Sequence, residues 1–230
     1  NIWSYIPKDV HNHPLIRVEY SPYAMQQTRN IVKFWVYDEA VRRTYVEWIS
    51  IDGAESKDLD DAIWAEKFHN WYRVYVHISD ITEIIKIYSP LDLEALKRTT
   101  SIYRKDRVLN MFPEELSQNI LSLDENWEKY TLSMKIDLDL YWNITDYGVF
   151  ESKFKYLKRY DYETFIDDFK NPDSEFHNHL QLMYEIARLR RSQRKTSWAN
   201  LDYDESDRRS YIWEKDNKIS FFDKWISKIL

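Results

Sequence analysis

Two runs of alternating apolar and polar residues limit the fold of this chain more than any other feature. Trp71–Ile78 and Tyr130–Leu140 repeat with a period of two, which is typical of half-buried β-strands. A third β-prone run, Ile144–Phe154, follows after a short segment around Trp142, where a hairpin turn is required. The first run also pairs back on the apolar run Ala62–Ala65. The patterns therefore predict a mainly antiparallel sheet.

Helical patterns lie between and after these runs. Ser89 and Pro90 open a predicted helix, and further helices are predicted over Tyr162–Phe169 and Leu180–Lys195. The last of these carries its apolar residues on one face. Residues 1–47 show no sustained period, and we assign no element to them. The sequence has no internal repeat and no linker, so we expect one α+β domain with flanking helices.

Composition excludes several classes of protein. The 230 residues include no Cys, which rules out disulfides, thiolate metal sites and cysteine nucleophiles. No apolar run approaches the roughly 18 residues of a transmembrane helix. We therefore expect no membrane partner and a cytoplasmic location. The net charge of -6 does not exclude RNA binding, because a local basic channel is sufficient.

Four aspartates fall within ten residues of one another, at Asp52, Asp58, Asp60 and Asp61. Carboxylate oxygens suit Mg²⁺ or Mn²⁺ better than Zn²⁺. Like charges this close require a cation or full solvation. The spacing is not that of a calcium-binding EF-hand loop. An acidic surface loop and a metal site both remain open on spacing alone.

The sequence around this cluster resembles the RNB catalytic domain of the ribonuclease II and ribonuclease R family. Residues 50–63 (SIDGAESKDLDDAI) are similar to its catalytic motif. The likeness continues in order through residues 72–81, 89–123 and 144–152 and runs from about residue 48 to 225. It divides the chain into an N-terminal segment, 1–47, and the N-terminal part of an RNB domain, 48–230.

The resemblance implies a 3′→5′ exoribonuclease that hydrolyses single-stranded RNA to nucleoside 5′-monophosphates with divalent metal ions. By position, Asp52, Asp58 and Asp61 correspond to metal-binding carboxylates, with Mg²⁺ or Mn²⁺ as cofactor. Asp60 corresponds to the remaining essential aspartate of the motif. Single-stranded RNA is the expected partner, and DNA is not expected.

The resemblance also implies RNA-binding residues. Tyr103 falls where the family places a tyrosine against the 3′-terminal nucleotide, and Tyr203 where an aromatic closes the base stack. Tyr162 aligns with another tyrosine near the site. Because the chain has 18 Tyr, core packing is the alternative for each of them.

Basic residues gather near the end of the last predicted helix. Arg188 and Arg191 are candidates for contacts to RNA phosphates, in a group that also includes Arg190, Arg194 and Lys195. The alternative is that they simply stabilise a helix C-terminus, which favours positive charge.

The family pattern continues beyond the likeness found here. The family's later segment that supplies a catalytic arginine has no counterpart in the sequence. We therefore expect the domain to be incomplete at the C-terminus and to be completed in cis or by a second chain. These 230 residues alone are then expected to be weakly active or inactive. The competing interpretation is an RNA-binding fragment or pseudonuclease without turnover. A weaker one is a structural subunit that binds a stabilising cation.

Glycine and tryptophan usage is unusual, with 2 Gly and 10 Trp. The resemblance implies that four of these Trp, at positions 71, 127, 142 and 198, stand at turns where family members usually carry glycine. We hypothesise that these are UGA codons of a genome that reads UGA as glycine.

Overall fold

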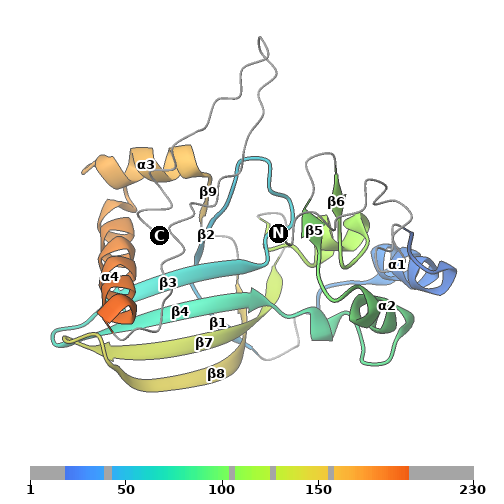
Figure 1. Cartoon of the computed structure of the whole chain (residues 1–230), viewed down its shortest axis with the longest axis horizontal. Helices are drawn as coiled ribbons and strands as arrows, with labels where there is room; N and C mark the ends of the chain where they lie inside the picture. The colour runs from blue at the N-terminus through green and yellow to red at the C-terminus, as the bar shows by residue number, and fades with distance from the viewer. Residues whose placement is uncertain (1–18, 39–42, 104–106, 125–127, 155–157, 197–230) are drawn as a thin grey trace, which may run out of the picture.

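The structure is a computed structural model that describes residues 19–38, 43–103, 107–124, 128–154 and 158–196. A curled seven-stranded sheet runs through it in the order β1-β8-β7-β4-β3-β2-β9 (Figure 1). The strands are β1 (Thr44–Tyr45), β2 (Ile49–Ile51), β3 (Asp61–Lys67), β4 (Trp71–Ser79), β7 (Lys129–Asp139), β8 (Ile144–Phe154) and β9 (Lys158–Tyr160).

The long central strands pair as the alternating pattern predicts. The pairs β3–β4, β4–β7 and β7–β8 are antiparallel, with Asp61 opposite Ile78 and Trp71 opposite Asp139. The short strands at the two edges depart from this pattern, because β1 pairs with β8 and β9 pairs with β2 in parallel. The prediction of a mainly antiparallel sheet with flanking helices is confirmed.

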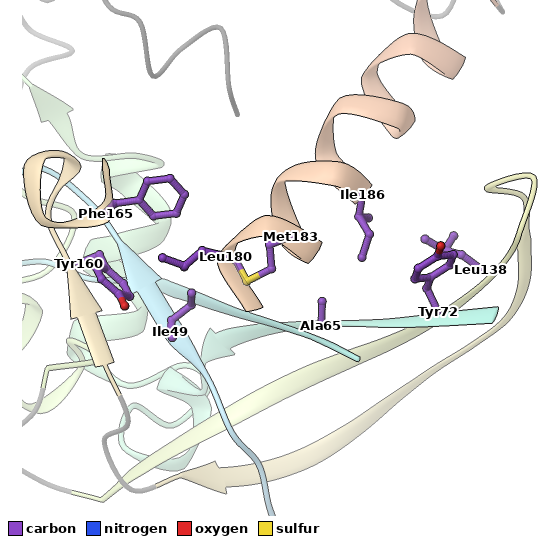
Figure 2. Close-up of a cluster of buried hydrophobic side chains, with 9 residues drawn as sticks. All are labelled: Ile49, Ala65, Tyr72, Leu138, Tyr160, Phe165, Leu180, Met183 and Ile186. Carbon is purple, nitrogen blue, oxygen red and sulfur yellow. The ribbon is translucent and has the colours of Figure 1, made fainter. Parts of the chain in front are cut away.

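Two helices cover one end of the sheet and build the larger core. They are α3 (Tyr162–Lys170) and α4 (His177–Thr196), and Figure 2 shows α4 directing its apolar side chains at the strands. Leu180, Met183 and Ile186 are buried against Ala65 and Leu138. Each fully buried aliphatic side chain of this kind stabilises the fold by about 1.5–3 kcal/mol. The predicted apolar face of this helix is therefore its core face.

A second cluster lies at the other end of the sheet (Figure 1). It consists of α1 (Pro22–Phe34), α2 (Pro90–Arg98), the 3₁₀ turn η3 (Ile81–Glu83), the π-helical turn η4 (Leu116–Ile120) and the hairpin of β5 (Ile102–Tyr103) and β6 (Val108–Leu109). Ala24 of α1 is fully buried against Leu91 and Leu116. None of the described helices is long and apolar enough to cross a membrane.

The helix α1 and the strand β1 lie in the segment to which the sequence pattern assigned no element. α1 begins with the same signal as α2: the Ser21 hydroxyl accepts a hydrogen bond from the Ala24 N–H, and proline follows the cap. A cap signal was therefore present for α1. The two-residue β1 carries no readable period, because its pairing is set by β8 rather than by local sequence.

Candidate functional site

The four aspartates lie on a loop, residues 52–61, that connects β2 to β3 and that we call the acidic loop. β2 ends at Ile51 beside the end of β9, and β3 begins at Asp61 beside the end of β4. Asp52 and Asp58 are half-buried, whereas Asp60 and Asp61 are exposed. The sheet thus fixes both ends of the loop.

Asp52 is held at the start of the acidic loop by the loop itself. Its Oδ1 accepts hydrogen bonds from the Gly53 N–H and the Ser56 hydroxyl, both at 2.7 Å. Its own N–H donates to the Tyr160 carbonyl of β9 at 3.1 Å. Both side-chain hydrogen bonds use Oδ1, so the other carboxylate oxygen of Asp52, Oδ2, has no hydrogen bond within the acidic loop.

Asp58 contacts Tyr103 directly. The Tyr103 hydroxyl donates to Asp58 Oδ2 at 2.7 Å, although the two residues are 45 positions apart. Partial burial and this carboxylate raise the pKa of the Tyr103 phenol above its ordinary value. Tyr103 as a whole nevertheless remains 66% exposed, so it lies at the surface next to the acidic loop.

The carboxylates also influence one another electrostatically. Desolvation, followed by the charges of Asp58, Asp61 and Asp52, raises the pKa of Asp60. Desolvation and the charge of Asp52 raise the pKa of Asp61. This repulsion would be relieved by a cation.

The donor chemistry of the acidic loop fits a hard divalent cation, but its carboxylates are not drawn together around one point. Among the described residues, no group of three or more acidic or histidine side chains has the geometry of a metal site. Asp58 is bound to the Tyr103 hydroxyl and Asp52 to Ser56. Each of these hydrogen bonds occupies one carboxylate oxygen, so a cation that binds the other oxygens would neutralise the loop and draw the carboxylates closer together.

Sequence reasoning missed several residues that hold the loop. The Arg159 guanidinium of β9 donates to the Ser56 carbonyl at 2.7 Å and to the Ala54 carbonyl at 3.5 Å. Arg159 is more than 100 positions from both residues, so no local pattern indicates the contact. Ser122 also reaches the loop from a distant segment.

Tyr162 lies near the same edge of the sheet as Asp52. It is the first residue of α3, directly after the N-cap Asp161, and Tyr160 of the preceding strand bonds to Asp52. The structure therefore brings Tyr103 and Tyr162 toward the end of the sheet that carries the acidic loop.

Arg188 lies elsewhere. It lines a cavity of about 470 Å³ with Lys67 and residues of α4. Lys67 ends β3 and Asp61 begins it, so roughly 20 Å of strand separates the two positions. The neighbouring Arg190 donates to the Trp142 carbonyl of the β7–β8 hairpin, also at the far end. The structure therefore does not bring Arg188 beside the acidic loop, and the roles of Arg188 and Arg191 in RNA binding stay predictions.

Tyr203, Trp127 and Trp198 lie outside the described residues, as do the side chains of Arg194 and Lys195. The histidines are consistent with structural roles. His77 is fully buried, and His179 accepts a hydrogen bond from the Ala65 N–H of β3 at 3.4 Å.

Known proteins share both the sequence and the fold. A model of the RNB domain family matches residues 42–223. Ribonuclease R of Thermotoga maritima is 37% identical over 177 residues, which are 74% of this chain and 25% of that protein. The chain thus spans about a quarter of the length of this curated relative.

Solved structures agree with the family match. Mycoplasma genitalium RNase R in complex with ribose methylated single-stranded RNA gives a TM-score of 0.69 at 23% identity, over 79% of this chain and 30% of that one. The yeast pseudonuclease Ssd1 gives a TM-score of 0.57 at 23% identity, over 68% of this chain and 20% of that one. The acidic loop, the curled sheet and these matches together show that the chain belongs to the RNB domain family.

Proposed function

We propose that this chain carries the acidic loop of a 3′→5′ exoribonuclease that hydrolyses single-stranded RNA to nucleoside 5′-monophosphates. The observation that carries the proposal is the contact between Asp58 and Tyr103. It places an exposed aromatic ring, suited to stacking on a base, directly against a cluster of four carboxylates. The named activity of the relative, ribonuclease R, supports the same reaction.

The proposal includes Mg²⁺ or Mn²⁺ held by Asp52, Asp58 and Asp61. When bound, such an ion lowers the pKa of water and stabilises charge on phosphate oxygens. The chain itself supplies the hard oxygen donors and a scaffold that fixes both ends of the loop. Asp60, whose pKa is raised by desolvation and then by the neighbouring charges, lies in sequence between two of the proposed ligands.

Tyr103 is the proposed contact for the 3′-terminal nucleotide. A base stacked on its ring would lie at the edge of the acidic loop, with its phosphate within reach of the carboxylates. Stacking does not depend on base identity, which suits an enzyme that removes successive nucleotides of any sequence.

The second candidate is an RNA-binding pseudonuclease. The arrangement of the described carboxylates favours the pseudonuclease. Asp58 is bound to Tyr103 and Asp52 to Ser56, and no three of the described carboxylates gather at one point. The fold is also shared with a protein described as a pseudonuclease. In this case the tyrosines would bind RNA without hydrolysis.

Asp60→Asn separates the two candidates. The exonuclease proposal predicts that this change, made in a protein that contains the whole RNB domain, abolishes hydrolysis of a labelled poly(A) oligomer with Mg²⁺ and leaves RNA affinity nearly unchanged. Asp146→Asn is the matched control. Asp146 is an exposed aspartate of β8 that forms an ion pair with Lys135 of β7, away from the acidic loop.

Three outcomes decide the question. Loss of turnover in Asp60→Asn, with normal turnover in the control, supports the exonuclease. Turnover of Asp60→Asn within about threefold of the unmodified chain removes the assignment of Asp60, because an essential group typically costs far more. RNA binding without hydrolysis by the unmodified protein that contains the whole RNB domain supports the pseudonuclease.

A further inference from the structure

Ser122 is a fully buried serine whose hydroxyl bridges the two backbone positions on either side of Asp58. The hydroxyl donates to the Lys57 carbonyl at 2.7 Å and accepts from the Leu59 N–H at 3.0 Å. Ser122 lies more than 60 positions from both partners. One side chain therefore fixes the backbone before and after a proposed metal-binding carboxylate.

The next residue adds a third contact. The Leu123 N–H donates to the Leu59 carbonyl at 2.7 Å, so both backbone groups of Leu59 are bound to the segment 122–123. Leu123 and Leu59 are themselves buried in one apolar cluster with Trp48. The acidic loop is thus fastened at Leu59 by hydrogen bonds and by packing.

The segment that carries Ser122 is in turn fastened to the sheet. The Ser79 hydroxyl at the end of β4 donates to the Leu121 carbonyl at 2.6 Å. The Ser79 N–H donates to the Asp60 carbonyl at 3.0 Å. Ser79 therefore ties the acidic loop and the segment of Ser122 to the same strand end.

A buried lysine holds the same segment from the other side. Lys129 is only 4% exposed, and its Nζ donates to the Asn119 carbonyl at 2.7 Å and pairs with Asp124 at 3.1 Å. These contacts span both ends of residues 119–124, with Ser122 between them. The hydroxyl is consequently part of a rigid support rather than of a mobile loop.

We propose that Ser122 is a positioning residue for Asp58, acting through the backbone of Lys57 and Leu59. The hydroxyl sets the direction in which the Asp58 side chain leaves the loop and meets the Tyr103 hydroxyl. The proposal rests on the proposed function in that Asp58 serves RNA hydrolysis. Without the hydroxyl, the Leu59 N–H and the Lys57 carbonyl lose this shared partner, so the backbone on both sides of Asp58 is held less firmly.

The test compares Ser122→Ala with Ser133→Ala in the full chain. Ser133 is also fully buried and hydrogen-bonded, at 2.5 Å to His77 Nδ1, but it lies in the sheet two strands from β3. Ser122→Cys, which fills the site with a weaker hydrogen-bonding group, serves if the alanine variant does not fold.

The first measurement does not depend on activity. Hydrogen exchange of the Leu59 amide should be about tenfold faster in Ser122→Ala, about threefold faster in Ser122→Cys, and unchanged in Ser133→Ala. The ¹³C resonance of the Asp58 carboxyl group should shift in the Ser122 variants alone. Unchanged exchange and an unchanged resonance would overturn the proposal, whatever the activity of the chain.

The second measurement is the rate on a single-stranded poly(A) oligomer. We expect kcat to fall about tenfold in Ser122→Ala with KM within about threefold, because RNA contacts are untouched. An equal fall of kcat in Ser133→Ala would show a general effect of stability and would overturn the positioning role. This rate is measured in a protein that contains the whole RNB domain. If that protein does not hydrolyse RNA, the proposed function fails, and the Asp58 resonance still decides the role of Ser122.

Discussion

At the scale of single residues, Trp142 is held in a backbone conformation that tryptophan rarely adopts. Its φ of 69° lies in the left-handed region, at the turn between β7 and β8. The ring stacks on Tyr72 with centroids 4.5 Å apart and packs against the main core. Backbone strain and favourable packing of the ring therefore act at the same position.

Replacing Trp142 by Gly and by Ala separates these two effects. Both changes remove the stacked ring, but only glycine tolerates the positive φ without strain. We expect Trp142→Gly to be more stable than Trp142→Ala by about 1 kcal/mol. Urea unfolding measures the difference. At the exposed Tyr141, whose φ is not positive, the glycine variant should be no more stable than the alanine variant. Equal stabilities at position 142 would contradict strain there.

The hydroxyl and the ring of Tyr103 should have separable effects. Tyr103→Phe removes the hydrogen bond to Asp58 and keeps the exposed ring. RNA affinity should then stay within about threefold, whereas Tyr103→Ala should weaken it by about 1–3 kcal/mol. Fluorescence anisotropy with a labelled oligomer measures both. If the phenylalanine variant binds as poorly as the alanine variant, the ring does not stack on RNA.

At the scale of elements, a row of buried polar side chains joins β4, β7 and β8. His77 bonds to Ser133, Ser133 contacts the Ser152 hydroxyl, and the Thr131 hydroxyl lies 2.6 Å from Ser152 Oγ. Burial lowers the pKa of His77 to about 4. Because desolvation disfavours the charged imidazole, protonation of His77 opposes folding and makes the strand junction sensitive to acid.

The sign of this pH dependence follows from the two states of the chain. The unfolded imidazole binds a proton below pH about 6.5, but the folded one does so only near pH 4. Stability is therefore fully present above the unfolded pKa and is lost as the pH falls toward 4. The loss is at most about 1.4 kcal/mol per pH unit.

Urea unfolding at pH 7 and pH 5 measures this loss. The free energy of unfolding should decrease less between the two pH values in His77→Gln than in the unmodified chain. His69→Gln, in the exposed β3–β4 turn, is the control. An identical decrease in all three proteins would contradict this role of His77.

Elements with a strong period or cap were predictable, and elements defined by distant partners were not. β4, β7, α2 and α4 follow their patterns closely. The strands β1 and β9 are two and three residues long, and their parallel pairing depends on β8 and β2. The location of Arg188 at the far end of β3 likewise depends on how α4 crosses the sheet, which helical periodicity does not specify.

The same division holds for the candidate site. The four aspartates and Tyr103 stand in sequence motifs, and the structure brings Tyr103 into contact with Asp58. Ser122 and Arg159 act through single side chains on backbone atoms of a distant loop. Serine and arginine are common at surfaces and in turns. Only the folded geometry therefore distinguishes Ser122 and Arg159 from other residues of the same types.

At the scale of the whole molecule, part of one face of the sheet is apolar and uncovered in the described structure. α4 packs over Ala65 and Leu138, but farther along the same strands Ile78, Leu132, Met134, Tyr147 and Val149 are 40–70% exposed. The register makes them neighbours across β4, β7 and β8. Contiguous apolar surface of this kind marks a site of association.

This face should bind a hydrophobic dye and promote self-association. We expect Val149→Lys to lower the fluorescence of bound anilinonaphthalene sulfonate and the sedimentation coefficient at high concentration. Ile87→Lys is the control, because Ile87 is 74% exposed and lies between η3 and α2, outside the strands that form this face. Absence of dye binding by the unmodified chain would show that the face is covered in solution.

The fastening of the acidic loop has a consequence for the order of folding. Its contacts come from Ser122, 63–65 positions away, and from Arg159, 103–105 positions away. Contacts of such long range form slowly, because a large loop of chain must close before they stabilise anything. The β3–β4 hairpin can form from neighbouring residues, but the carboxylates acquire their final geometry only after β9 has paired with β2. During synthesis, the carboxylates of the loop would therefore lack their final geometry until about a hundred further residues had left the ribosome.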